Sequence, residues 1–183
     1  MKQRLLLCGT LILLRSLLVE AQPAWSLNSI SVGTVTTGVG ATGVVVPISA
    51  TTDQRRTLLS VDVTFGASLC GMIQNQTIRK AGRTLQDAQS GGIKCPAEGK
   101  ISIRILDLLG GTAIPAGSGV IAEWVFDVRS DAAGGVFPLS ITVNQASNGP
   151  IAVPLSPSGG QLTTAMRGDV NCDLVDNSVD ALF

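Results

Sequence analysis

The sequence predicts an all-β protein, and three features lead to that prediction. Glycine supplies 21 of the 183 residues and aromatic residues only 3%, a composition that favours strands and turns over long helices. Apolar and polar residues alternate in several short runs, which is the period of a half-buried strand. Turn-forming residues separate these runs. Many short strands with regular turns imply a β-sandwich.

The alternation is clearest in the segment 120–128, which we expect to cross the core. Its presumed inward face is formed by Val120, Ala122, Trp124, Phe126 and Val128, and its reverse by Glu123 and Asp127, continued by Arg129. Segments 59–65 and 101–105 alternate in the same way. Further strands are predicted at 30–36, 44–50, 137–143 and 151–155, with turns at 38–43, 110–119, 131–135 and 148–150. A last strand and a short linker are expected in 156–167.

One stretch of this region, 74–90, is polar and shows no alternation. It is therefore predicted to be a long surface loop or an irregular edge. Arg79, Lys80 and Arg83 lie in it, and solvated side chains explain these charges more simply than a binding patch does.

The first 26 residues are predicted to be an export signal. Lys2 and Arg4 precede a mostly apolar run, 5–14, and small residues follow it. Cleavage is expected after Ala21 or after Ser26. The alternative is an uncleaved membrane anchor, for which the apolar run is short. The mature chain is expected to be extracellular, free or associated with the cell surface, and without stable membrane insertion.

Export places the remaining cysteines in an oxidising compartment. Cys70 and Cys95 are candidates for a disulfide, which would contribute about 3.5 kcal/mol on the chain-entropy estimate. Two buried thiols are the equally open alternative. Cys172 is then the odd cysteine, either free or available for a bond to another chain.

Charge and residue types exclude several classes of function. The formal net charge is zero with 14% charged residues, so the basic stripe of a nucleic-acid-binding protein is missing. The sequence contains no histidine, which excludes histidine-based triads and zinc sites. The candidate carboxylates for glycoside hydrolysis are Asp62, Asp107, Glu123 and Asp127. Each is interpreted more simply as an outward-facing strand or turn residue, so we expect no catalysis.

Oxygen-bearing residues near the C-terminus have the spacing of a calcium loop. The predicted ligands are the side chains of Asp169, Asn171, Asp173, Asn177 and Asp180 and the carbonyl of Val175, with Asn177 acting directly or through water. Leu174 stands where such loops need a glycine for a sharp turn, and Asp176 stands where an apolar residue is usual. Calcium affinity is therefore expected to be weak, with a dissociation constant on the order of 1 mM.

This C-terminal segment resembles the first calcium repeat of a dockerin module. The resemblance rests on Gly168-Asp169-Val170-Asn171, on Asp173, and on Asn177-Ser178-Val179-Asp180-Ala181-Leu182. It implies a calcium loop followed by the start of a helix, with Ser178 and Val179 at the positions that help to choose the partner. Residues 165–183 are therefore expected to form a linker and a truncated dockerin, which needs the complete module for calcium binding and docking.

The region 27–164 resembles a cohesin, or more broadly the carbohydrate-binding and cohesin sandwich superfamily. The matching segments are Ser31-Val32-Gly33-Thr34-Val35, the strand 59–65, Gly119-Val120-Ile121-Ala122, Phe126-Asp127-Val128 and Gly135-Val136-Phe137-Pro138-Leu139. The resemblance implies a jelly-roll-like sandwich of about nine strands that serves protein docking or sugar binding.

The function favoured by the sequence is a secreted, non-catalytic module for protein–protein assembly in extracellular polysaccharide degradation. Its expected partners are cohesin-bearing or dockerin-bearing proteins. The alternative is a carbohydrate-binding module that recognises a polysaccharide directly. Against it stands the scarcity of aromatic residues on which sugar rings stack: there is no tyrosine, and Trp124 alternates with core residues.

Overall fold

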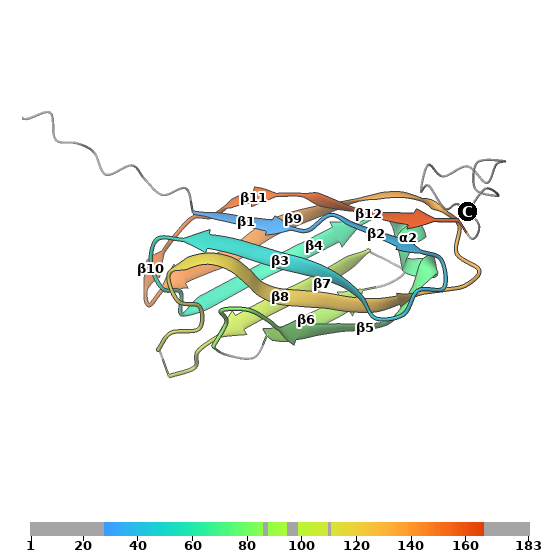
Figure 1. The fold of residues 1–183 in the computed structure, drawn as a ribbon. Coiled ribbons are helices and arrows are strands. Elements are labelled where there is room, and N and C mark those ends of the chain that lie inside the picture. The colour runs from blue at the N-terminus through green and yellow to red at the C-terminus, as the bar shows by residue number, and fades with distance from the viewer. Residues whose placement is uncertain (1–27, 86–87, 95–98, 110, 167–183) are drawn as a thin grey trace, which may run out of the picture.

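The computed structural model describes residues 28–85, 88–94, 99–109 and 111–166, with 88–94 described by their backbone alone. Its strands form two sheets that pack face to face as a β-sandwich (Figure 1). The all-β sandwich predicted from the sequence is therefore confirmed.

The first sheet contains five strands. Their order is β11 (Ser156–Ser158), β1 (Ser29–Val32), β3 (Val44–Thr52), β8 (Gly117–Val128) and β5 (Ile73–Lys80). All neighbours are antiparallel except β1 and β11. The longest pairing joins β3 to β8, so these two strands form the centre of the sheet.

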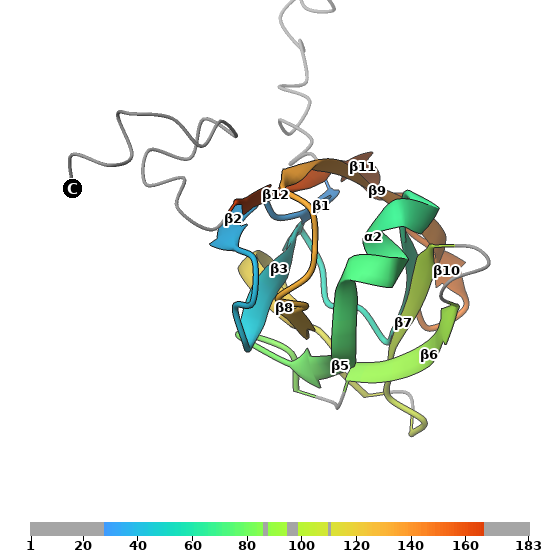
Figure 2. The ribbon, with the colours of Figure 1, turned by 90° about the vertical axis from the view of Figure 1, so that its right-hand side faces the viewer.

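The second sheet contains seven strands. Their order is β2 (Val35–Gly38), β12 (Gly160–Ala165), β9 (Gly135–Asn148), β4 (Leu58–Phe65), β7 (Lys100–Leu106) and β6 (Ala88–Lys94), and β10 (Ile151–Ala152) forms a hairpin with the end of β9. A short helix, α2 (Ala67–Met72), connects β4 to β5. It lies across one end of the sandwich (Figure 2).

The predicted strand 30–36 is two strands, because the chain crosses from the first sheet to the second at Gly33. The Gly33 amide donates to the Pro47 carbonyl at 2.8 Å, and a Cβ on Gly33 would come within 2.7 Å of the Pro47 ring. The chain makes the same crossing, from the first sheet to the second, between β11 and β12. It does so next to Gly160, where a Cβ would lie 2.3 Å from the Gly33 carbonyl oxygen. Only glycine permits backbones to approach this closely.

Of the two alternatives for 74–90, the long surface loop is wrong and the irregular edge is confirmed, because the segment contains β5 and the start of β6. Both are edge strands, each paired on one side only. Most β5 side chains after Ile73 are exposed, so no apolar alternation marks the strand. A register shift between Gln74 and Thr77 breaks the pattern further, with Asn75 at a φ of 54°. The edge position and the bulge together explain why the sequence shows no apolar alternation over β5.

Three other expectations need correction. Val120 does not share the inward face of β8, because the register with β3 shifts and leaves Ile121 as the extra residue, so that Ile121 and Ala122 are both buried. The strand predicted at 151–155 is reduced to β10. Helix α2 was not predicted. It carries buried Cys70, which takes part in a disulfide bond. Its predicted partner, Cys95, lies outside the described residues.

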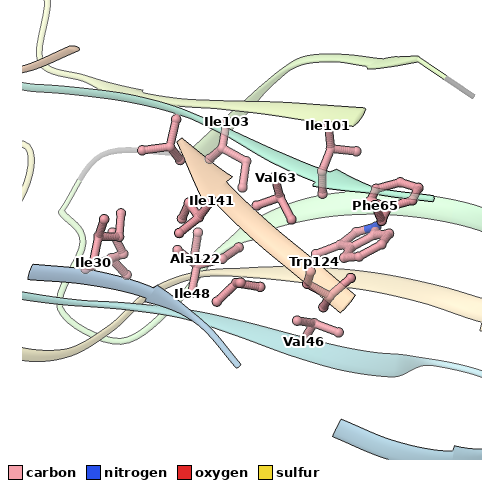
Figure 3. Close-up of a cluster of buried hydrophobic side chains, with 14 of the residues drawn as sticks. Ile30, Val46, Ile48, Val63, Phe65, Ile101, Ile103, Ala122, Trp124 and Ile141 are labelled. Carbon is pink, nitrogen blue, oxygen red and sulfur yellow. The ribbon is translucent and has the colours of Figure 1, made fainter. Parts of the chain in front are cut away.

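The core is an apolar layer between the sheets, in which Trp124 packs against Phe65 toward one side of the cluster (Figure 3). Trp124 is fully buried, and its ring centroid lies 5.0 Å from that of Phe65 on the opposite sheet and 4.5 Å from that of Phe126. Isoleucine and valine side chains of both sheets fill the rest of the layer. The sequence prediction that Trp124 lies in the core is therefore confirmed. Among the described residues, no helix is long and apolar enough to span a membrane.

One end of the sandwich is organised by a buried arginine that no sequence pattern marked. The Arg56 side chain is 1% exposed. Its guanidinium donates to the carbonyls of Gln54 and Arg55 at 2.8 and 3.1 Å. It also donates to Asn28 Oδ1 at 2.8 Å and to Asp53 Oδ1 at 3.3 Å. A single guanidinium therefore satisfies the acceptors of a tight turn and fixes the entry of the chain into β1.

We expect Arg56→Ala to lower the free energy of unfolding by about 3 kcal/mol, because it removes a fully buried side chain together with its hydrogen bonds to Asn28, Asp53 and the turn carbonyls. The matched control is Arg55→Ala at the exposed neighbouring position, with an expected change within about 0.5 kcal/mol. Urea unfolding followed by tryptophan fluorescence measures both. Equal effects of the two substitutions would contradict the structural role assigned to Arg56.

Candidate partner-binding surface

A β-sandwich offers its two outer sheet faces as large surfaces for binding. Residues on each strand alternate between the core and the outer face, so the outer residues follow directly from the buried ones. On the second sheet, the central strands β9, β4 and β7 present a broad polar face. Its alternate β9 residues from Val136 to Asn144 are all exposed.

Asp62 lies near the middle of this face and is held by its neighbours across the strands. Ser102 on β7 donates its hydroxyl to Asp62 Oδ1 at 2.6 Å. Lys100 Nζ lies 3.6 Å from Asp62 Oδ2. The side chain of Asn144 on β9 forms a further hydrogen bond with this carboxylate. The side chain of Asp62 is only 18% exposed, so the network presents a preorganised and partly desolvated charge to any partner.

These contacts decide the protonation of Asp62. Partial burial alone raises the pKa of a carboxyl group and is the largest single influence. The hydrogen bonds from Ser102 and Asn144 and the charge of Lys100 act in the opposite direction, and together they lower the pKa of Asp62 below its ordinary value of 3.8. At neutral pH the centre of the face therefore carries a fixed negative charge.

Apolar side chains lie at both ends of the same face. Val136, near the start of β9, is 51% exposed, and Leu106, at the end of β7, is 42% exposed. Leu106 is paired in register with half-buried Leu58 on β4. A polar centre between apolar groups is an arrangement suited to contact with another protein.

The outer face of the first sheet is different. Its β3 and β8 side chains are mostly half-buried, and none of the large apolar side chains that are highly exposed in the described residues belongs to it. Its charges are engaged locally, since Arg79 Nε donates to Glu123 and Asn75 Nδ2 donates to Asp127 at 2.7 Å. The second sheet therefore offers the better candidate surface.

The predicted solvated loop cations have different environments. Arg79 is exposed on β5 and paired with Glu123. Arg83 contradicts the prediction, because its guanidinium donates to the carbonyls of Pro115 and Ala50 and to Thr52 Oγ1. Burial, followed by the charge of Arg56, lowers the pKa of Arg83. Arg83 is thus a structural residue that ties the turn after β5 to the end of β3.

The carboxylates considered for glycoside hydrolysis do not form a facing pair among themselves. Asp62 lies on the outer face of one sheet, and Glu123 and Asp127 on the outer face of the other. Glu123 and Asp127 are four residues apart on one strand, a separation of about 13 Å against the roughly 5–9.5 Å that glycosidases use. Asp107 accepts a hydrogen bond from the amide of Leu109 in a turn.

The predicted calcium ligands and the predicted recognition residues Ser178 and Val179 lie outside the described residues. They remain predictions from the sequence, as does the calcium ion itself. In the part of the chain that the structure describes, no group of three or more Cys, Asp or Glu side chains is placed to hold a metal ion.

A stacking platform for sugar rings is missing from the described surface. Trp124 and Phe126 are completely buried, Phe65 is nearly so, and Phe137 packs against the core. These are the aromatic residues of the described ranges. The geometry therefore favours protein recognition over the stacking of a polysaccharide.

The sequence itself matches no known family model and no curated protein. The fold, in contrast, is similar to solved cohesin structures. The seventh type I cohesin of scaffoldin ScaB from Pseudobacteroides cellulosolvens superposes with a TM-score of 0.62 at 19% identity, over 77% of this chain and 94% of that one.

Two further structures show the same likeness. The sixth cohesin of scaffoldin B from Acetivibrio cellulolyticus, solved in complex with a mutant Cel5 dockerin, gives a TM-score of 0.62 at 18% identity, over 76% of this chain and 99% of that one. A non-cellulosomal cohesin from the archaeon Archaeoglobus fulgidus gives 0.60 at 11% identity, over 76% and 92%. The described residues therefore have the fold of a cohesin.

The Asp62 network makes stability depend on pH with a defined sign. Because the pKa of Asp62 is lowered in the folded state, its contribution is complete above the ordinary value of 3.8 and is lost as the pH falls below it. We expect Asp62→Asn to be destabilising at pH 7, by an amount that shrinks between pH 4 and pH 2.5. Urea unfolding across this range measures the difference. A difference that stays constant with pH would contradict the assignment.

Proposed function

We propose that this chain is a non-catalytic module for protein–protein assembly, and that it binds a dockerin-type partner through the outer face of the second sheet. The observation that carries the proposal is a cohesin fold whose β9, β4 and β7 present one open face with the Asp62 network near its centre. The proposal requires no catalytic step at this face, because the Asp62 carboxylate serves only as a hydrogen-bond acceptor and a fixed charge.

Two lines of reasoning support this choice of face. The cohesin of Acetivibrio cellulolyticus that shares the fold was solved with a bound dockerin, which makes a protein the natural class of partner. On the present chain, the second sheet combines a preorganised charge with apolar groups at both ends, and hot spots of interfaces are typically built from such partly desolvated centres. A partner would bury Thr142, which is exposed and lies directly beside Asp62 on β9.

The finer parts of the proposal rest on the sequence. Residues 1–26 support export, and the resemblance of residues 165–183 to a dockerin repeat supports a second connection to other modules. Together they favour a place in an extracellular assembly for polysaccharide degradation. Calcium would be held by the side chains of Asp169, Asn171, Asp173, Asn177 and Asp180 and the Val175 carbonyl, so that the loop serves as a structural clip.

The choice of the second sheet as the docking face is tested with two matched substitutions, one on each sheet. Thr142→Arg places a bulky cation in the middle of the proposed surface and should weaken binding of a cognate dockerin by at least about 100-fold. Thr77→Arg makes the same change at an exposed threonine of β5, on the first sheet, and should leave affinity unchanged. Surface plasmon resonance against purified dockerin modules encoded in the same genome measures both.

The outcomes of this experiment distinguish the two sheet faces from each other, and protein docking from carbohydrate binding. Loss of binding with Thr77→Arg and not with Thr142→Arg would assign docking to the first sheet. Failure of every dockerin to bind the unsubstituted chain, together with retention on immobilised cellulose or chitin, would replace assembly by carbohydrate binding.

The calcium loop is tested separately. Calorimetric titration of the longest form that the gene encodes should show calcium binding with a dissociation constant on the order of 1 mM or tighter. Asp169→Ala combined with Asp180→Ala should abolish it, because two of the oxygen ligands are then lost. Absence of calcium binding by the unsubstituted protein would remove calcium from the proposal.

A further inference from the structure

The exposed apolar side chains of the described residues are gathered at one end of the sandwich. Five of them lie at the end where β1 begins and β7 ends: Leu85 (57% exposed), Leu106 (42%), Leu108 (86%), Leu109 (97%) and Ile151 (65%). Val136 and Met166 lie at the opposite end. We refer to the five residues as the leucine end; its loops project at the left of Figure 1.

The most exposed pair, Leu108 and Leu109, stands on an ordered turn. Asp107 Oδ1 accepts a hydrogen bond from the Leu109 amide at 2.9 Å, and the Asp107 amide donates to the Thr57 carbonyl at 3.0 Å. The turn is therefore fixed at its base while both leucine side chains face solvent. Neither side chain contributes to the core, and their exposure has no role in the fold.

The turns of the leucine end are supported by a network of hydrogen bonds around Arg56 and Arg83. The Arg56 amide donates to the Ile114 carbonyl at 2.7 Å, which ties the segment after the turn to the start of β4. The Leu85 amide donates to the Ala113 carbonyl at 2.9 Å, and Arg83 donates to the carbonyl of Pro115. The turns that carry Leu85 and the Leu108–Leu109 pair are thus held together in one rigid unit.

Positive charge accompanies these apolar groups. Arg55, Lys80 and Arg104 are exposed at or near this end. The described acidic residues there are engaged, Asp53 with Arg56 at 3.3 Å and Asp107 in its turn. Apolar tips flanked by cations are complementary to an anionic bilayer, whose headgroups attract the cations while its acyl boundary takes up the leucines.

The chain also enters the sandwich at this end. Asn28 is bound there by Arg56 and accepts a hydrogen bond from the Asp53 amide at 2.9 Å. Only the eight residues 20–27 separate Asn28 from the apolar N-terminal segment, which is a reach of at most about 28 Å. An N-terminal segment held in the bilayer would therefore keep the leucine end within this distance of the membrane.

From these observations we propose that the leucine end is a peripheral membrane-binding site, in which Leu108 and Leu109 insert into an anionic lipid surface and the neighbouring cations contact its headgroups. A protein partner fits less well, because the most exposed leucines, Leu108 and Leu109, stand on one turn and Leu85 on another rather than on one shape-matched face. The site shares Leu106 with the outer face of the second sheet, but Leu108 and Leu109 lie beyond that face, on the turn after β7. Their insertion into lipid therefore does not depend on the proposed docking function.

The test uses residues 27–183, which retain every residue of the buried core and lack the apolar N-terminal segment. Sedimentation with vesicles of phosphatidylcholine and phosphatidylglycerol (3:1) should show binding that weakens as salt is raised. Vesicles of phosphatidylcholine alone should bind less. Leu108→Ser combined with Leu109→Ser should reduce the partition coefficient at least about tenfold, because both side chains no longer insert.

The matched control is Val136→Ser combined with Met166→Ser at the opposite end, which should bind vesicles like the unsubstituted protein. Circular dichroism of both double variants checks that they are folded. Absence of binding to the anionic vesicles, or equal binding by the leucine double variant, would overturn the proposal. Light scattering that showed a dimer dependent on Leu108 and Leu109 would overturn it in favour of a second copy of the chain.

Discussion

The packing of two sheets around Trp124 is the interaction on which the rest of this structure depends. Trp124 contacts Phe126 on its own strand and Phe65 on the facing sheet, so it joins the two layers. Burial of its large apolar surface stabilises the sandwich, and the neighbouring isoleucines and valines fill the remaining space. With the core filled in this way, function is left to the outer faces and the ends.

The two outer faces differ although both are built on the same alternation. On the first sheet, local ion pairs and hydrogen bonds satisfy Glu123 and Asp127. On the second sheet, Asp62 is also engaged, by residues from both neighbouring strands, but it lies near the middle of a face whose alternate β9 residues are all exposed. Cross-strand neighbours therefore convert an ordinary outward-facing aspartate into the centre of a candidate recognition surface.

The leucine end of the sandwich is held together differently from the apolar core between the sheets. There, the buried groups are the guanidiniums of Arg56 and Arg83, which satisfy backbone carbonyls of several turns. This polar network fixes the turns together with Ala113 and Ile114, whose side chains are fully buried in the core. It leaves the leucines of those turns exposed, and this combination of a rigid base with exposed apolar tips underlies the proposed membrane contact.

The sequence by itself determined the fold class, most of the strands, the inward position of Trp124 and the outward position of Asp62. These follow from alternation with a period of two, which is a local property of the chain. The calcium loop from Asp169 to Asp180 is also a local pattern, and it stays a prediction because it lies outside the described residues.

Only the tertiary structure decided which strands are neighbours, and with them the edge positions of β5 and β6, the bulge at Ile121 and the burial of Arg56. An edge strand loses its apolar alternation because it is exposed on more sides, and a bulge reverses the alternation within one strand. Arg56 is buried because its hydrogen-bond acceptors come from Asn28, Asp53 and the adjacent turn. Contacts between segments distant along the chain leave no periodic pattern in a single sequence, so these features required the folded chain.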